Sequence, residues 1–195
     1  MMSFFDGLTL ELVPHSASVS PERWTGDHAI RPLSEAGHQQ AKELVETMGT
    51  DVDAIYSSPA LRCLQTVQPL ARAAGLPIVE LVELLDTKEF AEPHEWTQGI
   101  FKPVREAIGG GWAAGHGLRA LVTMAESHPG GRVVAASHGD IIPTFFAMLC
   151  AVNDVPLPKV PQRGGWYTVR FAEGSFTITM NGTPHPGDVR PRSAR

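Results

Sequence analysis

The sequence has little that would direct a protein to a membrane. Its N-terminus lacks the basic segment and long apolar stretch of a secretory signal. The longest apolar run, residues 141–152, includes Pro143 and Thr144 and falls short of the roughly 20 residues that span a bilayer. We therefore expect no membrane partner and a cytoplasmic location.

Cysteine and basic charge are also scarce. The only cysteines, Cys63 and Cys150, lie in helical patterns without metal-ligand spacing, so we expect both to be reduced and buried. With 16 basic and 21 acidic residues, the net charge of −5 offers no broad positive field for nucleic acid. Six histidines show no paired-ligand spacing and are interpreted as scattered surface residues: His28, His38, His94, His116, His128 and His185.

What is present is an alternation of short Val-, Ile- and Leu-rich runs with segments of helical period. This alternation is typical of an α/β fold with three layers, in which helices cover both faces of a mostly parallel sheet. We expect a single domain over residues 1–180, followed by a Pro-, Gly- and Arg-rich flexible tail at 181–195. The expected parallel strands are residues 8–13, 53–57, 77–81 and 132–136.

Helix boundaries follow from caps and periodicity. Ser34 is expected to cap a helix that ends at Met48 before Gly49. A second helix is expected from about Ser58-Pro59 to Gly75, and others at 118–128 and 140–151. Residues 166–170 and 176–180 read as a terminal hairpin. The stretch 87–117 is interpreted as a long loop, a lid or binding loop.

Two histidines follow predicted strands directly. His15 ends the first apolar run. His138, in the segment Ser137-His138-Gly139-Asp140, follows another apolar run directly. Ligands bind outside the carboxyl ends of parallel strands, so both rings are expected to face one crevice.

Four motifs carry a resemblance to a known family. They are Leu12-Val13-x-His15, Arg31-Pro32-Leu33-Ser34-x-x-Gly37, Tyr56-Ser57-Ser58-Pro59-x-x-Arg62-x-x-Gln65-Thr66 and Ser137-His138-Gly139-Asp140. Together, in this order, they resemble the histidine phosphatase superfamily, whose founding members are the cofactor-dependent phosphoglycerate mutases, and most closely its small bacterial branch of phosphohistidine phosphatases. The resemblance implies a phosphoglycerate mutase-like fold.

The resemblance also implies roles for individual residues. His15 matches the histidine that attacks the phosphoryl group and becomes phosphohistidine, and neutral imidazole is nucleophilic near pH 7. Arg62 and His138 match groups that bind the phosphate, where an arginine offers a planar fork to two oxygens. The resemblance implies no metal and no organic cofactor. The implied partner is a phosphorylated small molecule or a phosphoprotein.

A general acid is needed to protonate the leaving oxygen. Alignment from Arg62 without gaps places Asp86 where the family usually has a glutamate. Glu83 is the alternative, and Glu89 is a third, poorer choice.

The chain departs from the family motif immediately before His15. The family has an arginine there, and this sequence has Pro14, so one phosphate-binding guanidinium is missing. Ser16 stands at the following small-residue position, where its hydroxyl could donate to phosphate. Arg23 and Arg31 are the nearest possible replacements along the sequence.

Two functions remain open because fold alone does not decide activity. The first is a phosphatase that works through phosphohistidine at His15, weakened or narrowed in substrate by Pro14. The alternative is a non-catalytic pseudo-phosphatase that binds a phosphorylated ligand. A phosphomutase is less favoured, because it must protect its phosphoenzyme from water. The sequence does not indicate an oligomeric state.

Overall fold

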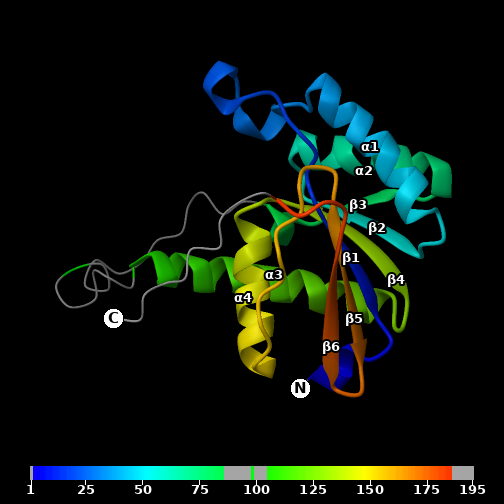
Figure 1. The fold of residues 1–195 in the computed structure, drawn as a ribbon, viewed down its shortest axis with the longest axis vertical. Coiled ribbons are helices and arrows are strands. Elements are labelled where there is room, and N and C mark those ends of the chain that lie inside the picture. Colours follow the sequence, from blue (N-terminus) through cyan, green and yellow to red (C-terminus); the bar gives the residue numbers. More distant parts are fainter. Residues whose placement is uncertain (1, 86–97, 99–104, 186–195) are drawn as a thin grey trace.

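A six-stranded sheet forms the centre of the molecule (Figure 1). The structure is a computed structural model, and it describes residues 2–85, 98 and 105–185. The strands are β1 (Thr9–Pro14), β2 (Ala54–Ser57), β3 (Ile78–Glu80), β4 (Arg132–Ser137), β5 (Trp166–Ala172) and β6 (Ser175–Asn181), in the spatial order β3-β2-β4-β1-β5-β6. The first four in this order are parallel, whereas β5 and β6 are antiparallel.

Helices cover both faces of the sheet. On one face, α1 (Glu35–Met48) and α2 (Leu61–Ala74) pack against Val13, Ile55 and Val134. On the other, α3 (Arg105–Ser127) and α4 (Ile141–Asn153) pack against Leu12 and Val133. Successive residues of one strand thus enter opposite cores, as strand pleating requires. The predicted three-layer α/β fold with a mostly parallel sheet is confirmed.

Short 3₁₀ turns complete the chain at η1 (Met2–Phe5), η2 (Pro21–Arg23), η3 (His28–Ile30) and η4 (Val82–Leu84). The expected cap of α1 is present, since the Ser34 hydroxyl accepts from the Gly37 amide and Gly49 follows at positive φ. The terminal hairpin of β5 and β6 also forms as predicted. No helix among the described residues is long and apolar enough to cross a bilayer.

The predicted loop over residues 87–117 is wrong for its second half. The α3 helix begins at Arg105 and runs through the glycine-rich part, and residues 86–97 and 99–104 lie outside the described residues. The expected helix at 118–128 is the end of this longer one. Gly117 explains part of the glycine content, because a Cβ there would lie 2.8 Å from Cδ2 of Phe145 on α4. The two helices pack too closely at that point for a side chain.

The first residues of the predicted tail are part of the fold. Asn181 ends β6, the Gln162 amide donates to the Thr183 carbonyl at 2.8 Å, and the His185 amide donates to the Val160 carbonyl at 2.7 Å. Residues 181–185 therefore hold the segment before β5, which lies beside the candidate site. Residues 186–195 lie outside the described residues.

Candidate active site

Two buried imidazoles meet at the carboxyl edge of the sheet. His15 follows β1 and His138 follows β4, and these parallel neighbours are in register with Pro14 beside Ser137. The ring centroids are 5.7 Å apart, and the residues are only 6% and 2% exposed. The parallel pairing of β1 with β4 therefore brings together two histidines that are more than 120 residues apart in sequence.

The hydrogen bonds of His15 define its tautomer. Its Nδ1 lies 2.8 Å from the Ser16 carbonyl oxygen, which can only accept, so Nδ1 carries a proton. The pKa of His15 is lowered to about 3, first by burial and further by the neighbouring basic groups Arg163, His138 and Arg62, against the opposing effect of the Ser16 carbonyl. At neutral pH the ring is uncharged and its lone pair is on Nε2.

His138 has the opposite tautomer. Arg62 Nη2 lies 3.0 Å from Nδ1 of His138, and because a guanidinium can only donate, this nitrogen accepts. The neutral ring then carries its proton on Nε2, which donates to the Ser58 hydroxyl oxygen at 2.8 Å. The buried Cys63, a free cysteine as is Cys150, places its Sγ 3.6 Å from the same Nε2.

Arg62 reaches the site from the first turn of α2, which begins after Ala60 instead of at the predicted Ser58-Pro59. Its side chain is buried, and Nη1 donates to the His28 carbonyl of η3 at 2.8 Å. The guanidinium is thus held at one end by a backbone carbonyl and at the other by the His138 ring. Such support from two directions limits the rotamers that the side chain can adopt.

The loop after His15 is held by the other motif residues. The Ser16 amide donates to the Thr66 hydroxyl at 2.9 Å, and that hydroxyl donates to the Arg62 carbonyl. Gly37 allows α1 to approach the loop, since a Cβ there would lie 1.9 Å from the Ala17 carbonyl oxygen. The buried Ser16 is therefore placed beside the histidines through its backbone.

Neither arginine proposed as a replacement on sequence grounds is brought to the histidines by a hydrogen bond of the described residues. Arg23 ends the exposed turn η2. Arg31 is buried, and its Nη1 donates to the Ser18 hydroxyl and the Val19 carbonyl. Arg31 thus stabilises the loop that follows His15.

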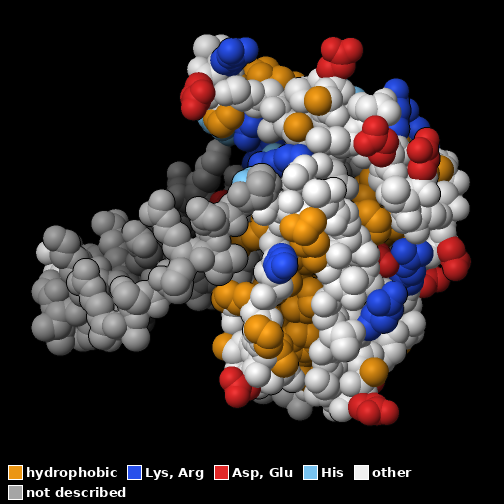
Figure 2. All heavy atoms as spheres, in the orientation of Figure 1, with side chains coloured by type: hydrophobic (Ala, Val, Ile, Leu, Met, Phe, Trp, Pro, Cys, Tyr) orange, Lys and Arg blue, Asp and Glu red, His pale blue; other side chains and the backbone are white. Residues whose placement is uncertain are grey.

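Sequence analysis missed Arg163, which does reach the site. This residue precedes β5, and its Nη1 donates to the His15 carbonyl at 2.9 Å. No motif surrounds this residue in the sequence. The antiparallel pairing of β5 with β1 places the segment before β5 over the end of β1. In Figure 2, Arg or Lys and His side chains lie together in a hollow below the upper helical part of the molecule.

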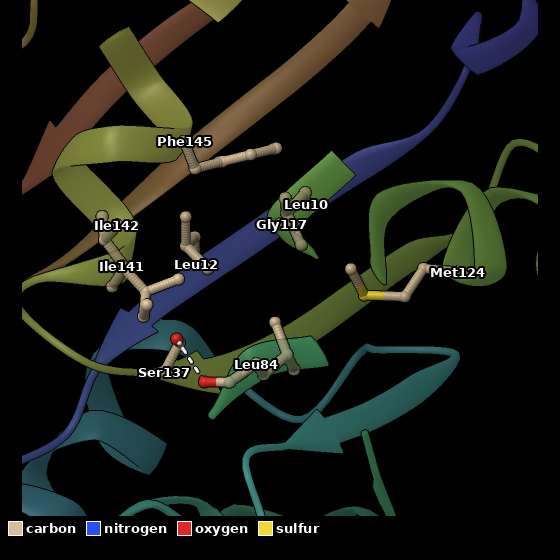
Figure 3. Close-up of a pocket in the computed structure, with 9 residues that line it drawn as sticks. All are labelled: Leu10, Leu12, Leu84, Gly117, Met124, Ser137, Ile141, Ile142 and Phe145. Carbon is tan, nitrogen blue, oxygen red and sulfur yellow. Dashed lines mark hydrogen bonds between the residues drawn. The ribbon is translucent and has the colours of Figure 1, made fainter. Parts of the chain in front are cut away.

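The structure describes one of the three candidate acids. Glu83 on η4 is half-buried and forms an ion pair with Arg119 of α3, at 3.1 Å. The η4 turn is joined to the end of β4 by a 2.8 Å bond from the Ser137 hydroxyl to the Leu84 carbonyl (Figure 3). The chain after η4 therefore starts beside the strand that carries His138. Asp86 and Glu89 lie outside the described residues.

Two cavities lie near this edge of the sheet. The one in Figure 3, between β1 and α4, is apolar, and its volume of about 10 Å³ is too small for a substrate. The other, of about 280 Å³, is lined by residues that include Pro14, Gly139, Arg163 and Tyr167. Among the described residues, no group of three or more His, Cys, Asp or Glu is arranged to hold a metal ion.

Comparison with known proteins agrees with this geometry. Residues 15–96 match the model of the histidine phosphatase superfamily (branch 1). The transcription factor tau 55 kDa subunit of Saccharomyces cerevisiae is 41% identical over 61 residues, 30% of this chain and 14% of the relative. The 8-oxo-(d)GTP phosphatase of Mycolicibacterium smegmatis is 31% identical over 91 residues, 46% of this chain and 28% of the relative. The aligned segments therefore cover less than a third of these relatives.

Solved structures share the fold over nearly the whole chain. Bacillus stearothermophilus YhfR is 21% identical, with a TM-score of 0.65 over 91% of this chain and 98% of its own. A phosphoserine phosphatase from Entamoeba histolytica is 20% identical, with a TM-score of 0.62 over 90% and 98%. Residues 15–96 thus match the histidine phosphatase superfamily (branch 1), and the solved structures show that the chain has a phosphoglycerate mutase-like fold.

Proposed function

We propose that this protein is a phosphatase that hydrolyses a phosphomonoester, on a small molecule or a protein, through a phosphohistidine at His15. One observation supports this proposal above the others. His15 is a buried neutral imidazole whose Nδ1 proton is bound by a carbonyl, so its Nε2 has a lone pair beside His138 and Arg62. A nucleophile that is unprotonated without a separate base suits attack on phosphorus.

In the first step, Nε2 of His15 attacks the phosphorus atom. An N–P bond forms, the ester P–O bond breaks, and the leaving oxygen takes a proton from a carboxylic acid. Arg62 and His138 bind the phosphoryl oxygens, His138 through the Nε2 proton that it donates to Ser58 in the free site. Donors placed there stabilise the charge that spreads over these oxygens in the transition state. Arg62 needs little rearrangement to do so, because two hydrogen bonds already hold its guanidinium in place.

In the second step, the same carboxylate takes a proton from water, and the resulting hydroxide attacks the phosphorus atom. The N–P bond breaks, orthophosphate leaves, and His15 returns to its neutral form. We assign the proton transfer to Asp86 or Glu83, which follow Arg62 in the sequence where the resemblance implies the general acid. The ion pair with Arg119 favours Asp86, because Glu83 would have to leave that partner to reach a substrate.

The alternative, a module that binds a phosphorylated ligand without turnover, is favoured by one observation. Pro14 stands where the family motif has an arginine, and the loss of one donor to a developing charge typically lowers rates by about 10²-fold to 10³-fold. Enzymes accelerate phosphate-monoester hydrolysis by up to about 10²¹-fold, so a weakened site can still turn over at a measurable rate.

Hydrolysis of p-nitrophenyl phosphate distinguishes the two functions. The phosphatase proposal expects phosphate release that persists in EDTA and falls by at least about 10³-fold in His15→Ala, because the covalent route is lost. His38→Ala, at an exposed position on α1, is the matched control and should retain the activity. If wild-type protein releases no phosphate but vanadate raises its melting temperature, the binding function replaces the catalytic one.

A further inference from the structure

We propose that Arg163 is the second phosphate-binding arginine of this site and takes the place of the guanidinium missing at position 14. The inference rests on the proposed function, because it names a further group that binds the same phosphoryl oxygens. It concerns a residue far from the motifs in sequence, on the segment between α4 and β5.

The position of Arg163 follows from the sheet. The antiparallel pairing places Tyr167 of β5 beside Leu12 of β1, so the residues before β5 lie over the last residues of β1. There the Arg163 guanidinium donates through Nη1 to the His15 carbonyl at 2.9 Å. It is therefore anchored on the backbone of the proposed nucleophile.

Pro14 and Arg163 line the same cavity of about 280 Å³, together with Gly139 from the loop after His138. An arginine at position 14 would extend from the wall of this cavity. Arg163, on the segment before the neighbouring strand β5, therefore borders the same space as residue 14 of β1. The exchange keeps a positive charge at this end of the sheet although the motif residue is a proline.

Electrostatic coupling agrees with this placement. The pKa of Arg163 is lowered, first by burial of part of its guanidinium and then by the charge of Arg62. The charge of Arg163 in turn contributes to the low pKa of His15. The guanidinium of Arg62 lies close enough to disfavour the charge of Arg163, and a phosphate dianion between the two groups would stabilise that charge.

The segment that carries Arg163 is rigidly supported. Gln162 donates through its amide to the Thr183 carbonyl, and Gly165 packs so closely that a Cβ there would lie 2.6 Å from the Asn181 carbonyl oxygen. Arg163 itself is exposed to solvent, so an incoming anion can reach it. A fixed base with an accessible, planar fork of donors is suited to phosphate recognition.

The test measures vanadate affinity by calorimetry and kcat/KM on p-nitrophenyl phosphate for Arg163→Gln and Arg163→Lys. Glutamine keeps an N–H donor of shorter reach but has no charge, whereas lysine keeps both a donor and a charge, so a role that depends on charge is lost only in the first substitution. We expect Arg163→Gln to weaken vanadate binding and to lower kcat/KM by about 10²-fold to 10³-fold, and Arg163→Lys to retain more of both. The control is Arg170→Gln, an exposed arginine at the far end of β5.

Rescue provides the decisive comparison. The double variant Pro14→Arg with Arg163→Gln should recover vanadate affinity and kcat/KM, because it restores a guanidinium in the same cavity.

Unchanged affinity and turnover in folded Arg163→Gln would overturn the inference while the wild-type phosphatase activity stands. If wild-type protein binds vanadate without turnover, weakened binding in Arg163→Gln supports Arg163 as an anion ligand although the catalytic proposal fails. If Arg163→Gln does not fold, Arg163→Lys decides: affinity and turnover below wild type support the inference, and wild-type values overturn it.

Discussion

Burial of a neutral His15 makes the stability of the protein depend on pH. The pKa of this ring falls from 6.5 to about 3 on folding, mainly because burial disfavours the imidazolium. Between these values the unfolded chain binds a proton that the folded protein does not. The contribution of the neutral His15 to the free energy of unfolding is therefore fully present above pH 6.5 and is lost as the pH is lowered toward 3.

The size of this effect follows from the same two values. A change of one pKa unit corresponds to about 1.4 kcal/mol, so the full loss between pH 6.5 and 3 is on the order of 5 kcal/mol. Between pH 7.5 and pH 5, a range in which unfolding is readily measured, the share of His15 is about 2 kcal/mol. This is a large fraction of the 5–15 kcal/mol that typically stabilises a domain.

Urea unfolding of wild type and His15→Asn at these two pH values measures that share. The asparagine amide can replace Nδ1 as donor to the Ser16 carbonyl but does not titrate. We predict that wild type loses about 2 kcal/mol more than His15→Asn on going to pH 5, and that His38→Asn, at an exposed position, behaves like wild type. Equal losses in wild type and His15→Asn would refute the argument that the folded site keeps His15 neutral.

Two further predictions concern glycines. Gly37→Ala should displace the loop after His15, because its Cβ would lie 1.9 Å from the Ala17 carbonyl oxygen, and should lower kcat/KM by at least about 10-fold; wild-type kinetics would show that the loop position does not matter. Gly111→Ala in α3 meets no atom within 4 Å and should stabilise the protein by about 0.5–1 kcal/mol in urea unfolding, whereas a loss of stability would contradict the helical packing described here.

Local signals predicted much of the fold. The Ser34 cap and the Gly49 stop define α1, and alternating apolar strands define the parallel part of the sheet. The start of α3 was missed because the run Gly109-Gly110-Gly111 resembles a loop in isolation. Only the packing of this helix against α4, where Gly117 touches Phe145, shows that some of its glycines serve close contact.

The clustering of His15, Arg62 and His138 could be predicted from the motifs, whereas the position of Arg163 could not. His15, Arg62 and His138 all stand next to strand ends or at a helix start, and the parallel pairing brings them together. Arg163 has no motif around it, and its position depends on β5 turning back antiparallel beside β1. Arg23 and Arg31 are nearer to His15 along the sequence and were therefore favoured. Distances in the folded protein depend on the order of the strands in the sheet, which brings Arg163 to His15 instead.

The most direct test of the central claim is to trap the phosphoenzyme. Wild-type protein mixed with a phosphorylated substrate and quenched with base should carry one phosphoryl group on His15, acid-labile as a phosphoramidate, in tryptic peptides analysed by mass spectrometry. His15→Asn should carry none. Turnover without any label on His15, or a label on another residue, would contradict the proposal that His15 is the nucleophile.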